Sequence, residues 1–162
     1  MMRFPMMLIL VLPLLAAAPA PETPAQLGRF GDFTFDASMY AVDGNNGLFT
    51  VRKHRGGDDD DVVMLVTIKD GPVSACSVAK LDEATNKEGR DRKFRTLVRD
   101  GFEIHMVSWY QGCRNARPPS VMACTVFRGR VYRFGAGSIG CRGGPGFGSR
   151  ADGFLGSLAP AP

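Results

Sequence analysis

One short stretch of the chain places chemically active side chains at the spacing that a site requires. Residues 102–111 alternate in hydrophobicity as in a β-strand, so Glu103, His105 and Trp109 are expected on one side of it. A histidine beside a carboxylate can act as a general base. The sequence places no nucleophile or metal ligand with them, which favours a solvent-facing histidine over catalysis. Trp109 is expected to pack against a covering element, and a cavity on its side of the strand would favour binding.

Candidate residues of a second kind are basic and lie in predicted loops and turns. Arg114 and Arg117 belong to the Pro-containing segment 114–119, and Arg128 stands before Gly129 in a predicted turn. The first 84 residues hold 7 basic and 11 acidic side chains, while the others hold 13 and 5, for a net charge of +4. Such asymmetry can attract an anionic partner or let two copies associate. A soluble surface with a chance skew explains it equally well.

Cysteines provide a covalent prediction. Cys76, Cys113, Cys124 and Cys141 are even in number, which favours two disulfides in an oxidising compartment. Of the three possible arrangements, Cys76 with Cys124 and Cys113 with Cys141 is favoured. No CxxC pair is present, so a zinc site is disfavoured.

Two further patterns suggest ligands but lack the required context. The acidic run Asp58, Asp59, Asp60 and Asp61 could supply oxygens to a calcium ion, but a solvated hairpin tip is favoured, and no metal is predicted. Residues 135–140 match GxGxxG, but no helix-forming segment follows them, as a dinucleotide site requires. No cofactor is predicted.

The first 20 residues have the composition of a secretory signal peptide. Arg3 precedes an apolar run from Met6 to Leu15, which is shorter than the ~20 residues that span a bilayer. Residues 21–29 are predicted to be a flexible lead. We expect an exported chain, periplasmic or extracellular. Its partner would then be an acidic protein, polysaccharide or lipid headgroup rather than nucleic acid.

Repeated hairpin patterns define the expected fold, a single α+β domain over residues 30–142. Val62–Cys76 predicts two strands around Asp70-Gly71, and Ser120–Phe134 repeats the pattern 58 positions later. Together they indicate possible repeats at about 43–79 and 101–137. The expected architecture is an antiparallel sheet of six or seven strands, in two related three-stranded meanders with one main helix between them.

Three segments outside the hairpins complete the prediction. Residues 91–99 are predicted to be the helix, because apolar residues recur there at helical spacing before Gly101. Residues 30–42 fit either a strand or a helix, and both interpretations stay open. Residues 143–162 are rich in Gly and Pro and predict little fixed structure.

No stretch of the chain carries a specific catalytic or cofactor signature. The favoured hypothesis is therefore an exported, non-catalytic binding or accessory module, which could act as an inhibitor. It would recognise a protein or an anionic envelope component through Arg114, Arg117 and Arg128. The first alternative is a small secreted hydrolase that uses His105 and Glu103. The second is a structural envelope protein that self-associates through its oppositely charged halves.

Overall fold

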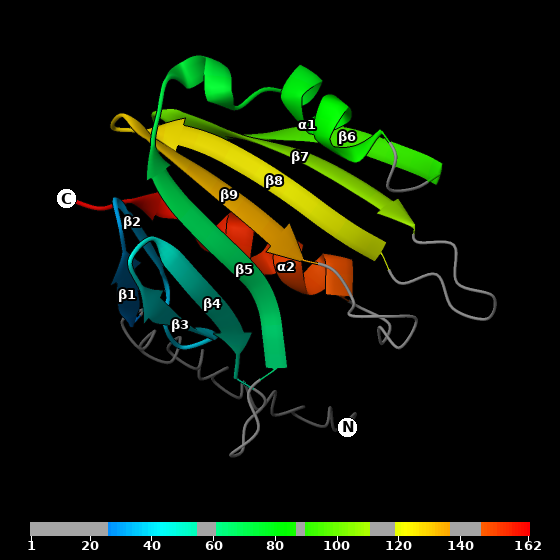
Figure 1. Ribbon diagram of the computed structural model, residues 1–162. Helices are drawn as coiled ribbons and strands as arrows, with labels where there is room; N and C mark the ends of the chain where they lie inside the picture. Colours follow the sequence, from blue (N-terminus) through cyan, green and yellow to red (C-terminus); the bar gives the residue numbers. More distant parts are fainter. Residues whose placement is uncertain (1–25, 55–60, 87–89, 111–118, 137–146) are drawn as a thin grey trace, which may run out of the picture.

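The computed structural model describes residues 26–54, 61–86, 90–110, 119–136 and 147–162 (Figure 1). Within these residues, ten strands form two antiparallel sheets, so the predicted antiparallel α+β class is confirmed. The larger sheet has the strand order β3-β4-β5-β9-β8-β7-β6. In chain order its strands are β3 (Tyr40–Asn45), β4 (Leu48–Lys53), β5 (Asp61–Asp70), β6 (Arg90–Arg99), β7 (Phe102–Tyr110), β8 (Pro119–Phe127) and β9 (Arg130–Ala136).

Tight turns join neighbouring strands of this sheet. Asn46 and Gly47 between β3 and β4 have φ values of 49° and 79°, and Arg128 and Gly129 between β8 and β9 have 50° and 77°. Two successive residues with positive φ suit the right-handed twist of a hairpin, and glycine adopts that conformation at little cost. The sequence therefore fixes these turns locally.

The inner face of the sheet carries the main hydrophobic core. Helix α2 (Phe147–Ser157) lies against this face, as does the small sheet of β1 (Leu27–Phe30), β2 (Phe33–Asp36) and β10 (Ala159–Pro160). Alternate strand residues point inward, because successive side chains of a strand face opposite sides. The fully buried side chains of this core include Phe33, Met64, Ile104, Met106, Tyr132, Phe134, Phe154 and Leu155. Each contributes about 1.5–3 kcal/mol by burial.

The outer face is covered over β7 and β8 by η1 (Val73–Ala75) and α1 (Val78–Thr85). A disulfide joins Cys76, just before α1, to Cys124 in β8, with the two Cα atoms 5.7 Å apart. Leu81 of α1 packs beside it with Val107 and Trp109 of β7. Figure 1 shows α1 and α2 on opposite faces of the sheet. The expected Cys76–Cys124 pair is therefore present and fixes α1 to the sheet.

The predicted helix at 91–99 is wrong, because these residues form the edge strand β6. They pair with β7 in an antiparallel register that joins Arg99 to Phe102 and Phe94 to Val107. Arg95 forms an ion pair with Asp152 of α2, on the inner side. Apolar residues at 94, 97 and 98 suit a helix face, but here Leu97 packs toward the core and Val98 is 70% exposed. Pairing with β7 outweighs the local helical spacing.

The predicted duplication is also incorrect, because the second strand expected in the first copy, at residues 73–79, does not form. Val62–Cys76 and Ser120–Phe134 both begin with a strand, but the partner of β5 is β9 and not residues 73–79. Pro72 has no N–H to donate, and Ser77 caps α1 by accepting a hydrogen bond from the Lys80 N–H at 3.2 Å. The chain therefore turns into η1 and α1 instead of a second strand. The two segments are not equivalent three-stranded meanders.

Both ends of the described chain are more ordered than predicted. Residues 27–29, expected in a flexible lead, belong to β1, and residues 30–42 are resolved as strands rather than helix. Residues 147–162, expected to have little fixed structure, form α2 and β10, and Phe154, Leu155 and Leu158 are buried in the main core. The glycines within α2 lower its helix propensity, so the sequence alone does not indicate a helix there. The predicted signal peptide lies outside the described residues.

Candidate functional site

A groove follows the outer face of the large sheet beside α1. It joins three hollows of about 300, 380 and 490 Å³, which overlap through Thr67, Ala75, Ala84, Met122 and Arg133. We call this surface the outer groove, with a lining from β5, β7, β8, β9 and the η1–α1 segment: Leu65, Thr67, Lys69, Ala75, Leu81, Ala84, Trp109, Ser120, Met122, Val131, Arg133 and Gly135. Hollows of this size are typical of small-molecule sites.

Strand alternation and register bring these residues together. Thr67 of β5 stands opposite Arg133 of β9, and Arg133 stands opposite Cys124 of β8. Because residues opposite one another in a sheet project to the same face, their side chains form one row across the groove. The disulfide at Cys124 holds the covering segment at the end of this row. The groove thus has a rigid floor and one covalently fixed wall.

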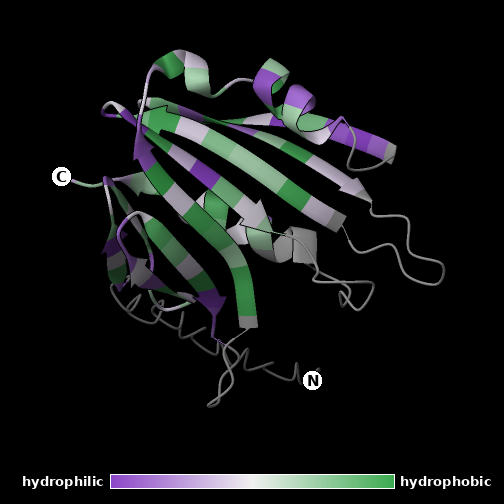
Figure 2. Ribbon diagram, in the orientation of Figure 1, coloured by the Kyte–Doolittle hydropathy of each residue, from purple (hydrophilic) through white to green (hydrophobic). Residues whose placement is uncertain are grey.

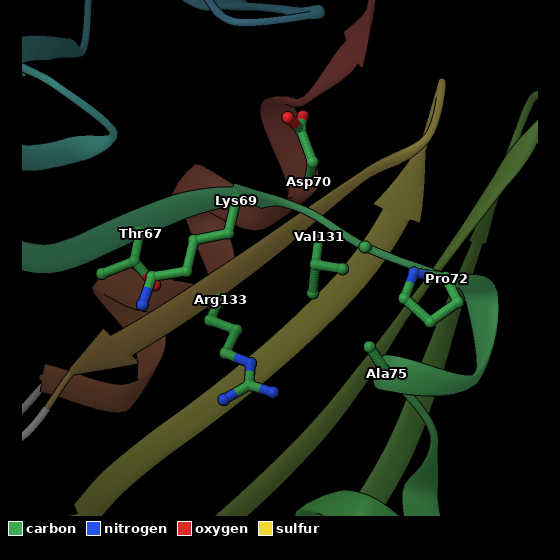
Figure 3. A pocket seen from close by; sticks show the side chains of 8 residues that line it. Thr67, Lys69, Asp70, Pro72, Ala75, Val131 and Arg133 are labelled. Carbon is green, nitrogen blue, oxygen red and sulfur yellow. The ribbon is translucent and has the colours of Figure 1, made fainter.

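Two cationic side chains in the outer groove have no acidic partner among the described residues. Arg133 borders all three hollows and Lys69 borders one, and neither forms an ion pair there. Figure 3 shows Lys69 and Arg133 reaching to the same side of the sheet, while the Asp70 carboxylate points away from them. Asp70 lies instead 4.0 Å from Arg130. Asp70 and Glu83 also line these hollows, but each lies beside another cation, Arg130 and Lys80 respectively. Arg133 and Lys69 therefore keep their charge without an acidic partner in the part of the chain that the structure describes.

The surface around these cations is largely apolar. Met122, Val131 and Ala75 line the groove, and Leu65 and Leu48 on the outer face of β5 and β4 are 51% and 56% exposed. Figure 2 shows green, hydrophobic residues along β5 and β8, whereas β6 carries purple, hydrophilic ones. Contiguous apolar surface with a few placed charges is typical of a binding site.

Two polar groups at the β7–β8 end of the groove are buried without partners. Trp109 is 6% exposed and Ser120 is 1% exposed, and both line the hollow of about 490 Å³. The Trp109 Nε1 and the Ser120 Oγ make no hydrogen bond to any residue that the structure describes. Trp109 packs with Leu81, Val107 and Cys124, as expected for a residue beneath a covering element. It also lines the hollow of about 490 Å³, so Trp109 both packs beneath α1 and borders the groove.

His105 and Glu103 share the outer side of β7, as the alternation predicts, but they do not line the outer groove. The His105 Nδ1 is hydrogen bonded to the Thr96 Oγ1 of β6 at 3.0 Å. Glu103 is exposed and stands opposite Val98. The structure therefore gives His105 a hydroxyl partner and places it away from the three hollows.

The predicted basic contacts have different positions. Arg128 lies in the β8–β9 turn, where its Nη2 donates to the Ala161 carbonyl at 3.0 Å and its guanidinium stacks 5.1 Å from the Phe127 ring centroid. Arg128 thus fastens the C-terminal strand to the sheet. Arg114 and Arg117 lie outside the described residues, as do Cys113, Cys141 and Asp58–Asp60. Asp61 begins β5.

The residues that the sequence did not single out are Arg133, Lys69 and Ser120. Arg133 had a local signal, because it is the charged member of an outward-facing row with Val131 and Gly135. Its meaning depends on the pairing of β9 with β5, which joins segments about 65 residues apart and cannot be read from local periodicity. The groove itself was therefore not predictable.

The described residues contain no cluster of three or more His, Cys, Asp or Glu side chains placed to hold a metal ion. No helix in this part of the chain has the length and apolar character needed to cross a membrane.

Comparison with solved structures finds proteins with a similar fold. No known protein family matches the chain, and no curated protein matches its sequence. The fold is similar to the solution structure of cyanobacterial PsbP (CyanoP) from Synechocystis sp. PCC 6803, with a TM-score of 0.49 and 14% sequence identity. The similarity covers 90% of this chain and 99% of that chain. Functional inference therefore rests on the residues of the present chain.

Proposed function

We propose that this chain is an exported, non-catalytic binding module that takes up an acidic amphiphile in the outer groove. Such a ligand has a carboxylate or phosphate head and an apolar body, as in a fatty acid or an anionic lipid. The observation that carries this proposal is the pair of cations Arg133 and Lys69, which have no acidic partner among the described residues and lie beside an apolar groove floor.

Charge supports an anionic ligand. Arg133 presents a planar guanidinium that can bind both oxygens of a carboxylate or phosphate at once. Lys69 lies two residues from Thr67, the register partner of Arg133, so both cations serve the same part of the groove. Lys80 at the α1 side is already paired with Glu83, with 2.9 Å between Nζ and Oε2. A single acidic head near Arg133 would satisfy the unpaired charges.

The shape of the groove supports an apolar body. Its hollows continue from Lys69 past Met122 to Trp109, along strands whose outward residues are mostly uncharged. Apolar area contributes about 25 cal/mol per Å² when water is removed from it. A free anion such as acetate would leave this surface wet. An acyl chain would cover it, so the amphiphile gains binding free energy from both of its parts.

Binding to the variant Arg133→Gln tests this proposal. We expect dodecanoate to bind the wild-type chain and to change the emission of Trp109, which is the sole tryptophan and lines the groove. Loss of a charge-assisted contact costs about 1.5–3 kcal/mol, so Arg133→Gln should weaken binding by about tenfold to a hundredfold. Acetate and dodecanol should each bind much more weakly than dodecanoate.

A matched control removes an equal charge elsewhere. Arg29 is exposed in β1, forms no ion pair in the described residues and lies in the small sheet, on the inner side. Arg29→Gln should bind dodecanoate like the wild type. Equal weakening by both variants would show that net charge, rather than a site at Arg133, governs binding. An absence of dodecanoate binding would reject the groove as an amphiphile site.

The basic residues predicted from the sequence could add contacts to an acidic partner outside the groove. Arg114 and Arg117, outside the described residues, stay proposed contacts for an acidic partner. Arg128 is the weaker candidate, because its guanidinium already binds the Ala161 carbonyl.

A further inference from the structure

The Trp109 end of the outer groove holds two hydrogen-bonding groups that have no partner among the described residues. Trp109 in β7 and Ser120 in β8 are direct register partners, so their side chains project side by side from the outer face. Both are more than nine-tenths buried, and both border the same hollow. Neither the indole Nε1 nor the hydroxyl Oγ has a hydrogen-bond partner in the described part of the chain. Such groups are rare in folded proteins and indicate a missing partner.

The chemistry of the two groups defines that partner. An indole N–H can only donate, so the atom that meets the Trp109 Nε1 must be an acceptor. The Ser120 hydroxyl can also donate a hydrogen bond. A carbonyl oxygen has two lone pairs and is able to accept from both groups at once. An alkyl chain that ended here would leave both donors unsatisfied and buried.

We propose that the natural amphiphile carries a second polar group, an ester or amide carbonyl, that accepts hydrogen bonds from Trp109 and Ser120. This inference rests on the proposed function. The acidic head binds at Arg133, and the carbonyl lies at the other end of the groove. Cys124, the β8 partner of Arg133, is four residues from Ser120. Four residues along a strand correspond to about 14 Å. The long Arg133 side chain can shorten the distance that the ligand must span between its acidic head and its carbonyl.

An open path joins the two ends. Gly135 lies between Arg133 and the Trp109 end, opposite Met122 of β8, and lines the same hollow as Trp109. A Cβ atom built on Gly135 would have no atom within 4 Å, so the space above it is free. The absent side chain leaves room for a continuous ligand body. The ligand class is therefore an acyl ester or amide with an acidic group at a distance, as in an acidic lipid.

A matched pair of probes tests the carbonyl directly. The first is tetradecanoate, and the second is the monomethyl ester of tetradecanedioic acid, which has an acidic head at one end and an ester carbonyl at the other. We expect the ester to bind about tenfold more tightly. The single indole N–H resonance, observed with ¹⁵N labelling, should move downfield with the ester and much less with tetradecanoate.

Two variants distinguish recognition of the ligand carbonyl from binding of the ligand body along the groove. Trp109→Phe removes the indole donor and should abolish the preference for the ester over tetradecanoate. Gly135→Val fills the path with a side chain that suits a strand and whose Cβ has no atom within 4 Å, so it should weaken both long probes about tenfold or more. Circular dichroism of each variant checks that the fold is retained.

The possible outcomes distinguish this inference from the proposed function. Equal affinity for the two probes, with an unmoved indole resonance and a strong effect of Arg133→Gln, would overturn the carbonyl and keep the amphiphile site. Binding of neither probe would overturn both. A preference for the ester that survives in Trp109→Phe would also contradict the inference, because it would place the carbonyl elsewhere.

Discussion

At the residue scale, Tyr132 shows how a buried hydroxyl fixes one part of the fold to another. Its Oη–H donates to the Asp32 Oδ2 at 2.7 Å, and the Asp32 N–H donates back to the Tyr132 Oη at 2.9 Å. Phe33 stacks edge-on against its ring, with centroids 4.7 Å apart. These contacts tie the β1–β2 hairpin to β9. Burial, followed by the hydrogen bond to Asp32, raises the pKa of Tyr132 to about 12.

This shift predicts a loss of stability at alkaline pH. Between about pH 10 and 12 the unfolded phenol loses its proton while the folded one keeps it, so the free energy of unfolding falls as pH rises. Two pKa units correspond to at most about 3 kcal/mol. Below pH 10 this contribution is fully present. Urea unfolding of wild type and Tyr132→Phe across this range should show the extra loss in the wild type alone.

The same variant should be less stable than wild type by about 1–2 kcal/mol at neutral pH, because it leaves the Asp32 groups without their partner. Subtracting the variant's profile removes the contribution of every titrating group that the two proteins share. Parallel pH profiles for the two proteins would contradict the role assigned to the Tyr132–Asp32 contact.

Single residues differ in how much the sequence reveals about them. Trp109 was predicted to pack under a covering element, and it does, because alternation in β7 fixes its face. The same alternation correctly placed Glu103 and His105 together on the outer side. Whether a cavity adjoins a side chain depends on elements that arrive from elsewhere in the chain. For Trp109 that element is α1, and for His105 the structure supplies Thr96 of β6.

At the element scale, α2 depends on a glycine that lets it approach β3. A Cβ atom on Gly153 would lie 2.5 Å from the Tyr40 Oη, which is closer than non-bonded atoms tolerate. Tyr40 is 5% exposed and its ring packs 5.3 Å from that of Phe154. Burial, with a smaller effect of Asp36, also raises the pKa of Tyr40. The glycine therefore serves packing rather than helix stability.

Two glycine substitutions in this helix should have opposite effects. Gly153→Ala should lower the free energy of unfolding by about 1–2 kcal/mol, because overpacking outweighs the gain in helix propensity. Gly156→Ala places its Cβ 3.5 Å from the Arg99 Nη2, an ordinary contact, and should be neutral or stabilising by up to about 1 kcal/mol. Urea denaturation measures both. Equal free energies of unfolding for the two variants would show that Gly153 is not packed closely against Tyr40.

The disulfide gives the η1–α1 segment its fixed position. It links residues separated by 48 positions, and closing a loop of that length restricts the unfolded chain by about 4 kcal/mol in the chain-entropy view. Leu81 and Ala84 of the same helix border the outer groove. The bridge thus stabilises the fold and sets one wall of the proposed site.

Errors in predicting the elements have a common physical cause. Residues 91–99 have helical apolar spacing but become β6 because β7 offers an unpaired edge. Residues 73–79 lack a free strand edge, because β9 occupies the position beside β5. Residues 147–157 contain glycines that disfavour an isolated helix, yet they form α2 against the core. In each case long-range packing outweighs local propensity.

At the scale of the whole molecule, the acidic and basic halves of the chain do not form separate bodies. The acidic half supplies β5 and the basic half supplies β9, and these two strands pair at the centre of one sheet. The β8–β9 hairpin could be predicted, since its turn depends on neighbouring residues, whereas the hairpin predicted around Asp70-Gly71 was wrong. The strand order, and with it the outer groove, could not be predicted, because both arise from pairing between distant segments.

The most direct test of the amphiphile site is the pattern of backbone amide shifts when dodecanoate is added to the ¹⁵N-labelled chain. We predict that the largest changes fall in β5, β8, β9 and α1, around Arg133, and that they shrink strongly in Arg133→Gln. Changes centred instead on the β6 edge or the β1–β2 hairpin, or a spectrum that does not change, would contradict the account.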